Sequence, residues 1–319
     1  MLKLFKRDAR SILGIDISST SVKIIELSRK EGNCCIEGFG CELLPPDAVE
    51  GHTIKDIDAV ASTIRHIVSG SHLQSKLAIL ALPDSAVISK ILQVNDDLNE
   101  AEIEEFIIME ADKYIPYPID EITIDFEILG ESLKIPDRLD VLMVASRSEN
   151  VSSRVSALTK AGLQVKIVDV ESFAIERAIQ LLATTLPAAS DKIIAVIDIR
   201  DEFMNLYVLH QMKIIYTHQD EFGKVVNPSM EMFLLQVKRA LQFFFSTSHH
   251  GFVDYILLAG EAERCSDLAP LIEKNTKIPT SIANCARHLR LGDKLDSTNI
   301  LNVAPSLLMA CGLALRNIG

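Results

Sequence analysis

One short pattern occurs twice in this sequence, and it constrains the fold more than any other feature. Residues 12–27 form an apolar segment that ends in Asp16, a turn of small hydroxyl residues and a second apolar segment. Residues 193–209 follow the same pattern, with Asp198 at the end of the first segment. Both read as strand hairpins. Two such hairpins predict two similar halves that face each other across a cleft, each contributing one Asp.

The length and the charge limit the class of protein. A chain of 319 residues, 48% of them apolar, is long enough for two or three domains with buried cores. The formal net charge of -12 argues against a nucleic-acid partner, because the phosphates would be repelled. The six cysteines lack the Cys-x-x-Cys or Cys/His spacing of metal sites. We therefore expect free thiols in a reducing cytoplasm.

Nothing in the sequence predicts insertion into a membrane. No apolar run approaches the roughly 20 residues that a membrane-spanning helix needs. The N-terminus is basic without a long apolar stretch, so it is not typical of a secretory signal. Leu2, Leu4 and Phe5 lie among its basic residues and would allow weak contact with an anionic surface, although a solvated terminus is the simpler interpretation. At most, the chain is expected to be peripheral to a membrane.

Apolar periodicity predicts an ordered series of strands and helices. The first half is expected to have strands at 12–17, 21–28 and 33–41 before a helix that ends at Gly70. Residues 76–165 read as a small sheet with two helices on one face. The second half is expected to have strands at 193–199, 203–209 and 212–217, a long helix at 229–245 and a last helix at 305–316. The predicted domains are 1–75 with 166–189 (first half), 76–165 (insert) and 190–319 (second half).

This layout resembles that of the actin, sugar-kinase and Hsp70 superfamily. More narrowly, the chain resembles the PilM family, the FtsA-like proteins of type IV pilus assembly. The motifs that carry the resemblance lie at 13–23, 110–118, 168–171, 241–245, 253–256 and 310–316, so it covers almost the whole chain. It implies an α/β class: a duplicated actin-like (ribonuclease H-like) ATPase fold with an FtsA-type α+β insert and a truncated second-half subdomain.

The resemblance also implies where a nucleotide would bind. In such folds ATP lies between the halves, and the first turn surrounds its phosphates with backbone N–H groups and hydroxyls. Asp16 would hold Mg²⁺ through water, because this ion keeps several of its own waters. The ancestral nucleotide-binding residues implied in this way are Asp16, Ser18, Ser19, Thr20, Ser21, Lys23, Asp198 and Gly260. A hairpin turn held by its own hydroxyls is the competing interpretation of the first turn.

Three departures from the family pattern weaken the case for a nucleotide. The second turn reads Arg200-Asp201-Glu202, where the family has a glycine that gives the backbone room. Glu261 stands where the family has a second glycine after Gly260. Residues 224–228 form only a turn before the long helix, where the family has a subdomain that walls the adenine pocket. We therefore expect no cofactor, with ATP and Mg²⁺ as the alternative.

The leading hypothesis is a cytoplasmic scaffold at the inner face of the bacterial inner membrane. By resemblance it would bind the N-terminal tail of PilN in a groove between 1–75 and 76–165, alongside other inner-membrane pilus assembly proteins. Tyr114 and Tyr117 belong to that region, and packing at the edge of the core explains them as well. Enzymatic activity stays open, with a degenerate actin-like ATPase that has lost activity as the preferred interpretation, and self-association stays open too.

Two other functions are weighed against the scaffold. One is an ATP-binding switch or slow ATPase in which Asp198 positions water or metal. The other is a sugar or small-acid kinase, which is disfavoured because no sugar-binding insert is recognisable. His249-His250 lacks a third ligand at metal spacing and is expected to be a solvated helix end.

Overall fold

The computed structural model describes residues 11–183, 191–200, 202–222, 229–292 and 295–316. The chain forms two compact units: unit 1 combines Met1–Ala81 with Ala157–Gly319, and unit 2 is Leu82–Ser156. Unit 1 contains both halves of the predicted duplication. The predicted division into three domains stays a prediction, although a strand within 76–165, at Leu77–Leu82, pairs inside the first sheet of unit 1.

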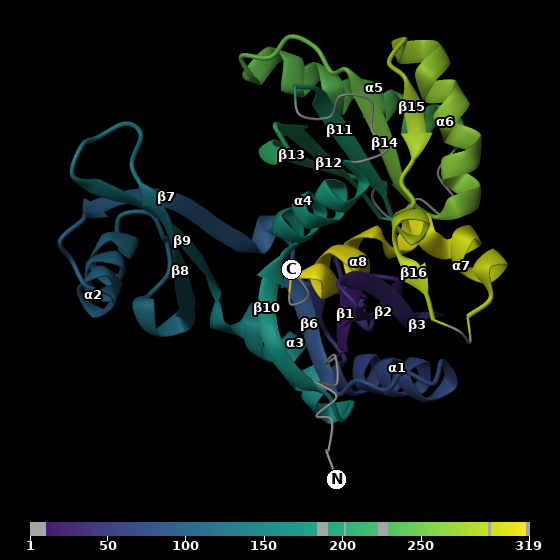
Figure 1. The fold of residues 1–319 in the computed structure, drawn as a ribbon, viewed down its shortest axis with the longest axis horizontal. Helices are drawn as coiled ribbons and strands as arrows, with labels where there is room; N and C mark the ends of the chain where they lie inside the picture. The colour runs from purple at the N-terminus through teal and green to yellow at the C-terminus, as the bar shows by residue number, and fades with distance from the viewer. Residues whose placement is uncertain (1–10, 184–190, 201, 223–228, 293–294, 317–319) are drawn as a thin grey trace. The chain divides into compact units, whose positions relative to one another are not determined.

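The first half of unit 1 is built on a six-stranded sheet (Figure 1). Its strands, in spatial order, are β10 (Gln164–Val170), β6 (Leu77–Leu82), β1 (Ile12–Ile17), β2 (Ser21–Lys30), β3 (Asn33–Leu43) and β16 (Arg290–Leu291). β1 pairs antiparallel with β2 and parallel with β6. Almost all of β1 is buried, which explains why its sequence is a continuous apolar run.

The second half repeats this arrangement. Its five-stranded sheet runs β15 (Thr280–Ile282), β14 (Tyr255–Gly260), β11 (Ile193–Ile199), β12 (Phe203–His210) and β13 (Lys213–Glu221). β11 pairs antiparallel with β12 and parallel with β14, as β1 does with β2 and β6. The two sheets therefore share one topology, and the predicted duplicated fold is confirmed.

Helices α4 and α8 lie between the two sheets (Figure 1). They belong to one continuous core that also takes side chains from β1 and β11. Helix α1 packs on the outer face of the first sheet, and α5 and α6 pack on the outer face of the second. Helix α7 adds Ile300 to the core between the sheets. The helices of unit 1 are α1 (Ile57–Gly70), α4 (Glu171–Leu182), α5 (Met230–Thr247), α6 (Ala262–Thr276), α7 (Ser297–Val303) and α8 (Leu308–Leu315). A short ribbon of β4 (Val49–Glu50) and β5 (Thr53–Ile54) precedes α1.

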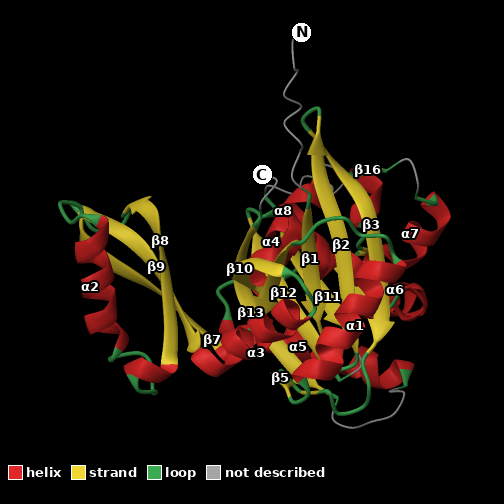
Figure 2. Ribbon diagram, turned by 90° about the horizontal axis from the view of Figure 1, so that it is seen from below, coloured by secondary structure: helices red, strands yellow, loops and turns green. Residues whose placement is uncertain are grey.

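Unit 2 is a three-stranded antiparallel sheet with helix α2 on one face (Figure 2). Its elements are β7 (Val87–Asn95), α2 (Glu100–Ala111), β8 (Ile122–Glu131) and β9 (Arg138–Arg147). Asn99 caps α2, and Glu102 completes a capping box. The expectation of two helices on one face is wrong. Helix α3 (Ser148–Lys160) ends instead with Ala157 and Leu158 in the core of unit 1.

The structure differs from the prediction for the last helix, and several other predicted segments lie outside the described residues. The predicted last helix at 305–316 starts too early: residues Ala304–Leu307 form a short 3₁₀ turn that contains Pro305, and α8 begins at Leu308. The preceding helix α7 is not predicted. The segment Thr298–Leu315 is apolar and long enough to cross a membrane, but 61% of it is buried within the fold. The N-terminal residues 1–10, Asp201 and the turn at 224–228 are not among the described residues.

Candidate functional site

The turn after β1 is held together by its own hydroxyl groups. The Ser18 Oγ donates to the backbone oxygen of Ser21 at 2.9 Å, and it accepts from the Ser21 N–H at 3.0 Å. The two hydroxyls are also 3.1 Å apart. Two of the predicted phosphate-binding hydroxyls therefore close the hairpin turn. In the β1–β2 register, Lys23 lies opposite Asp16.

The turn after β11 places Arg200 at the corresponding position of the second half. The Arg200 N–H donates to the Phe203 backbone oxygen at 2.9 Å, which closes the turn between β11 and β12. Asp198, at the end of β11, accepts a hydrogen bond at 2.9 Å from the Arg200 Nε. The Arg200 side chain therefore contacts the last polar residue of its own strand, Asp198.

Arg200 joins the two halves of unit 1 by ion pairs. Its Nη1 is 3.1 Å from the Asp16 Oδ1 and 3.8 Å from the Glu171 Oε1. Asp16 comes from β1 of the first half and Glu171 from the start of α4. Only 9% of the Arg200 side chain is exposed, and its acidic partners are buried to a similar degree. One guanidinium thus contacts three carboxylates in the interior.

The charge of Arg200 is strongly favoured by this setting. Burial works against the guanidinium cation, but the carboxylates of Asp16, Asp198 and Glu171, with a smaller contribution from Tyr207, outweigh it. Together they raise the pKa of Arg200 well above its ordinary value. The Arg200 Nη2 is buried and has no hydrogen-bond partner among the described residues.

A cavity of 1460 Å³ opens beside this ion-pair cluster. Its lining includes Ser18, Thr20, Ser21 and Lys23 from the first hairpin, and Arg200 from the second. Asp16 and Asp198 do not line the cavity themselves but contact Arg200, which does. Basic residues that sequence reasoning does not single out, Arg264, Arg287 and His288, line it as well. The structure therefore brings the predicted hydroxyl turn to a cavity, while both predicted Asp residues bind the arginine.

The end of β14 shows why Gly260 is a glycine. Its φ of +117° is unfavourable for a residue with a side chain, and an added Cβ would meet the Ile199 backbone oxygen at 2.1 Å. Gly260 therefore allows β14 to approach β11 closely. The next residue, Glu261, lines the cavity and pairs with Arg264 at 3.2 Å. Ser19, the remaining predicted residue, is partly exposed in the first turn.

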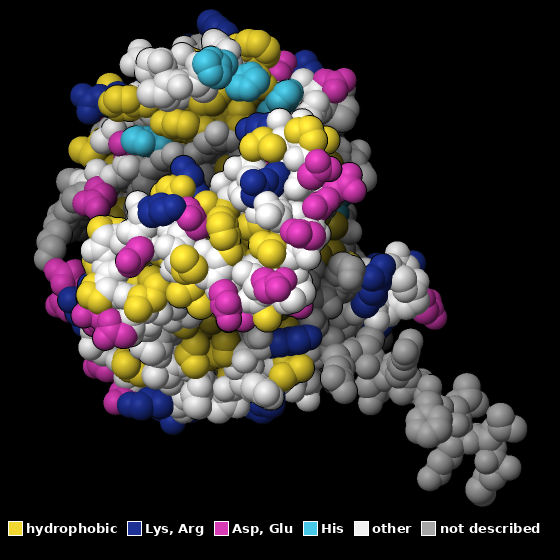
Figure 3. Space-filling model, turned by 90° about the vertical axis from the view of Figure 1, so that its left-hand side faces the viewer, with side chains coloured by type: hydrophobic (Ala, Val, Ile, Leu, Met, Phe, Trp, Pro, Cys, Tyr) yellow, Lys and Arg dark blue, Asp and Glu magenta, His cyan; other side chains and the backbone are white. Residues whose placement is uncertain are grey.

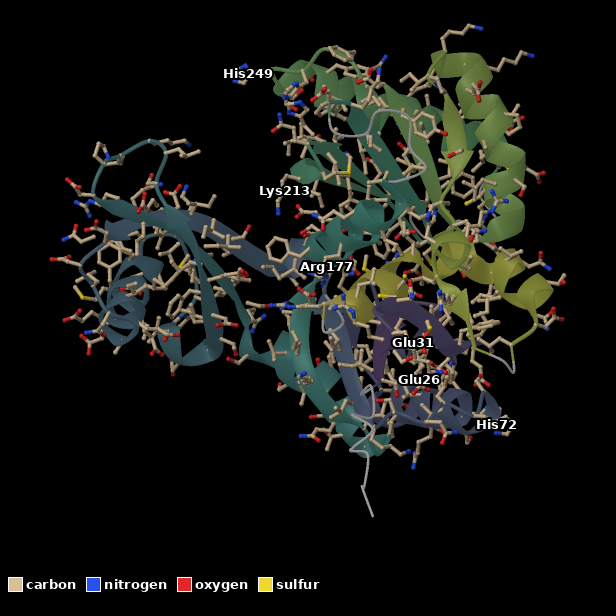
Figure 4. All side chains as sticks on the ribbon, in the orientation of Figure 1. Glu26, Glu31, His72, Arg177, Lys213 and His249 are labelled. Atoms are coloured by element: carbon tan, nitrogen blue, oxygen red, sulfur yellow. The ribbon has the colours of Figure 1, made fainter. Side chains whose placement is uncertain are left out.

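A second ion-pair cluster, around the buried carboxylate of Asp169, connects the motif at 168–171 to the last helix. Arg177 donates to Asp169 and also, through its Nε, to the Gly312 backbone oxygen at 3.0 Å. Arg316 reaches the other oxygen of Asp169 at 2.6 Å. Arg177 is labelled in Figure 4, where it lies close to α8 and the end of the described chain. This cluster lies among core elements and is structural.

Sequence reasoning identifies most residues of the site but not the ion pairs through which Arg200 joins the two halves of unit 1. It identifies Arg200 as a replacement for glycine, without its contact to Asp16. It identifies Glu171 only as part of a motif. A signal for the role of Glu171 exists, because this residue directly follows the buried end of β10 and begins α4. In the described part of the chain, no group of three or more His, Cys, Asp or Glu is arranged to hold a metal ion.

Comparison with known proteins decides the family. The sequence profile of the family described as type IV pilus assembly protein PilM matches residues 14–225 and 223–318. The chain belongs to the PilM family. A solved structure described as "PilM-PilN type IV pilus biogenesis complex" superposes with a TM-score of 0.78 and 22% identity, covering 98% of this chain and 99% of that chain.

More distant relatives share the fold. The ethanolamine utilization protein EutJ from Carboxydothermus hydrogenoformans superposes with a TM-score of 0.53 and 13% identity, covering 96% of this chain and 89% of that chain. At these identities the structural matches establish the architecture alone. With the shared sheet topology, they confirm the actin-like fold of this PilM family member.

Proposed function

We propose that this chain is a cytoplasmic scaffold of type IV pilus assembly. It binds the N-terminal tail of a PilN-type inner-membrane protein at the inner face of that membrane, and its nucleotide binding is weakened or lost. Membership of the PilM family supports the pilus assembly role. The superposed structure is a complex of PilM with PilN, and its fold is shared by this chain, which supports a PilN-type partner.

The observation that carries the scaffold role is the surface of unit 2. Of the 17 large hydrophobic side chains that are exposed among the described residues, ten lie in this unit. In Figure 3, hydrophobic and acidic side chains lie intermixed on the face that is drawn. Exposed apolar side chains gathered in one unit are available to pack against a partner. We therefore propose that the tail contacts unit 2, which makes up most of the 76–165 side of the expected groove.

The charge of unit 2 suggests the chemistry of the partner. Residues 82–156 contain 17 Asp or Glu against six Lys or Arg, a formal charge of -11. The whole chain has a formal charge of -12, so nearly all of the excess negative charge lies in this unit. An acidic and apolar surface favours a segment that is basic and apolar, because opposite charges attract and apolar groups pack on its hydrophobic side chains.

Binding of a synthetic PilN-type tail tests the scaffold. Tyr117, 42% exposed and stacked on Arg147, is the residue to change. Tyr117→Ala is expected to weaken the tail's affinity about tenfold, as removal of an aromatic anchor does. Phe252→Ala, at an exposed aromatic residue of unit 1, is the matched control and is expected to leave affinity unchanged. Failure of the wild type to bind at tens of micromolar would contradict the scaffold.

The nucleotide part of the proposal has its own test. The two acidic residues that would position Mg²⁺ are engaged by Arg200, which supports weak or absent nucleotide binding. A fluorescent ATP analogue titrated with Mg²⁺ is expected to show no micromolar binding. Saturable binding in that range would support the alternative, an ATP-binding switch, while leaving the result of the tail experiment unaffected.

A further inference from the structure

The buried cation between the two halves is part of the protein itself. Arg200 is held between Asp198 of its own half and Asp16 of the other, with Glu171 next to them. A buried charge is stable only when it is paired, and three buried carboxylates this close together repel one another. The arrangement therefore requires a cation at this position.

The position and the contacts of Arg200 are those expected of a bridging cation. Asp16 ends β1 and Asp198 ends β11, the equivalent strands of two sheets with the same topology. The Nη1 and Nε of a single planar guanidinium reach one carboxylate from each half, at 3.1 and 2.9 Å. A guanidinium presents several donors in a fixed geometry, so it joins two carboxylates without a hydration shell.

A free divalent ion would compete poorly with this side chain. Arg200 is attached to the same turn as Asp198 and is fixed there by the hydrogen bond from its N–H to the Phe203 oxygen. Tethering gives the guanidinium a high effective concentration at the two carboxylates. Mg²⁺ gives up its waters reluctantly and would have to displace a buried, paired group. The residues of this cleft therefore do not fit the hydrated metal that an actin-like site holds.

We propose that Arg200 is a built-in cation that takes the place of the divalent metal and holds the two halves of unit 1 together without metal or nucleotide. This inference goes beyond the proposed function, because it concerns the state of the cleft and needs no pilus partner. The cleft of this chain is thus set in one arrangement by its own sequence, independently of ligand concentration.

Thermal unfolding of the full chain, with and without millimolar Mg²⁺, tests the inference. Wild-type Tm is expected to be unchanged by Mg²⁺. Arg200→Ala leaves Asp16 and Asp198 without their bridging cation and is expected to lower Tm by roughly 5–15 °C. Added Mg²⁺ should then recover part of this loss in the variant, because the hydrated ion can bridge Asp16 and Asp198 through its waters.

The control variants show whether Arg200 takes the place of a metal ion or is only an ion-pairing arginine like others in the protein. Arg177→Ala removes a partly buried arginine that pairs with the buried Asp169, and it is expected to lower Tm with no recovery in Mg²⁺. Arg200→Lys keeps the positive charge and should stay insensitive to Mg²⁺, and Arg200→Gln serves if the alanine variant does not fold. Stabilisation of the wild type by Mg²⁺, an unchanged Tm in Arg200→Ala, or no recovery in the neutral variants would each overturn the inference.

Discussion

At the residue scale, one buried carboxylate, that of Glu26, holds a loop in place by hydrogen bonds. Glu26, on β2, is only 1% exposed and accepts hydrogen bonds from the Ser11 hydroxyl at 2.5 Å and from the backbone N–H groups of Gln74 and Ser75 at 2.8 and 2.9 Å. It thereby fixes the loop that leads into β6. A carboxylate, which presents two acceptor oxygens, suits this setting because each of these three contacts is a donor.

Replacement of Glu26 by Gln tests this role. The Gln amide group would present N–H donors where the protein also presents donors, so at least one buried hydrogen bond is lost. We expect the free energy of unfolding to fall by about 1–3 kcal/mol, measured by urea denaturation. Glu31→Gln, at an exposed turn labelled with Glu26 in Figure 4, is the control and should change stability by less than about 0.5 kcal/mol. Equal effects in the two variants would contradict the interpretation.

At the scale of elements, helix α8 depends on two glycines. A Cβ at Gly312 would lie 1.9 Å from the Ala174 oxygen of α4, and one at Gly14 of β1 would lie 1.9 Å from the Ala310 oxygen. Both contacts are with backbone atoms, which cannot turn aside. The close packing of α8 on α4 and β1 therefore requires glycine at both positions, and this packing joins the two sheets through one core.

Gly312→Ala is expected to separate α8 from α4. We predict a loss of about 3 kcal/mol or more in the free energy of unfolding, because the added methyl group has no space. Gly70→Ala is the matched control: Gly70 ends α1, and nothing lies within 4 Å of an added Cβ. Alanine is the better helix former there, so stability is expected to rise by roughly 0.4–1 kcal/mol. Urea denaturation of both variants measures the contrast.

The start of β11 supplies a prediction about pH. Burial raises the pKa of Asp254, but the Ile193 N–H and the Lys192 ammonium outweigh it and lower this pKa below the ordinary 3.8. A lowered pKa in the folded state stabilises the fold above about pH 4 and ceases to do so as the pH falls through the folded-state value. Asp254→Asn should therefore cost about 1 kcal/mol at pH 7 and progressively less in acid.

Urea denaturation of the wild type and Asp254→Asn at neutral and acidic pH measures this difference. Asp267→Asn, at an exposed residue that lines the cavity, is the control and should show no such pH dependence. A difference between wild type and Asp254→Asn that stays constant from pH 7 down to about pH 3 would show that the Asp254 carboxylate is not the stabilising group.

At the scale of the whole molecule, charge and apolar exposure are divided unequally between the two units. Unit 1 is nearly neutral, while unit 2 contains almost all of the net negative charge and most of the exposed large hydrophobic side chains. Its own core, formed by the sheet and α2, is small. An acidic unit with a small core and many exposed apolar groups is suited to recruiting a partner segment.

This division predicts a salt-dependent interaction. Binding of a basic, apolar tail peptide to the full chain should weaken severalfold between low and high ionic strength, because salt screens the attraction to unit 2. The measurement is fluorescence anisotropy at several salt concentrations. A peptide of the same apolar residues with acidic side chains in place of the basic ones is the control and should bind poorly at low salt. Affinity that is independent of salt would contradict a basic partner.

Individual strands and helices show which features of the fold can be predicted from the sequence and which cannot. The strands at 12–17 and 193–199 have the bounds that their apolar runs predict. The last helix is predicted to begin at Pro305, three residues before α8 does, because the apolar run there has no periodicity that separates the 3₁₀ turn from the α-helix. Helix α3 is assigned to the wrong core because an amphipathic pattern shows that a face is buried but not what it packs against.

The sequence by itself determined the duplicated hairpins, the two strand-end aspartates and the uneven distribution of charge, since these follow from local pattern and composition. The tertiary structure alone decided what the aspartates bind. Asp16 and Arg200 are 184 positions apart, and their ion pair exists only because α4 and α8 bring the ends of β1 and β11 together. Local propensities carry no information about such a contact, because its distance depends on how the two sheets pack.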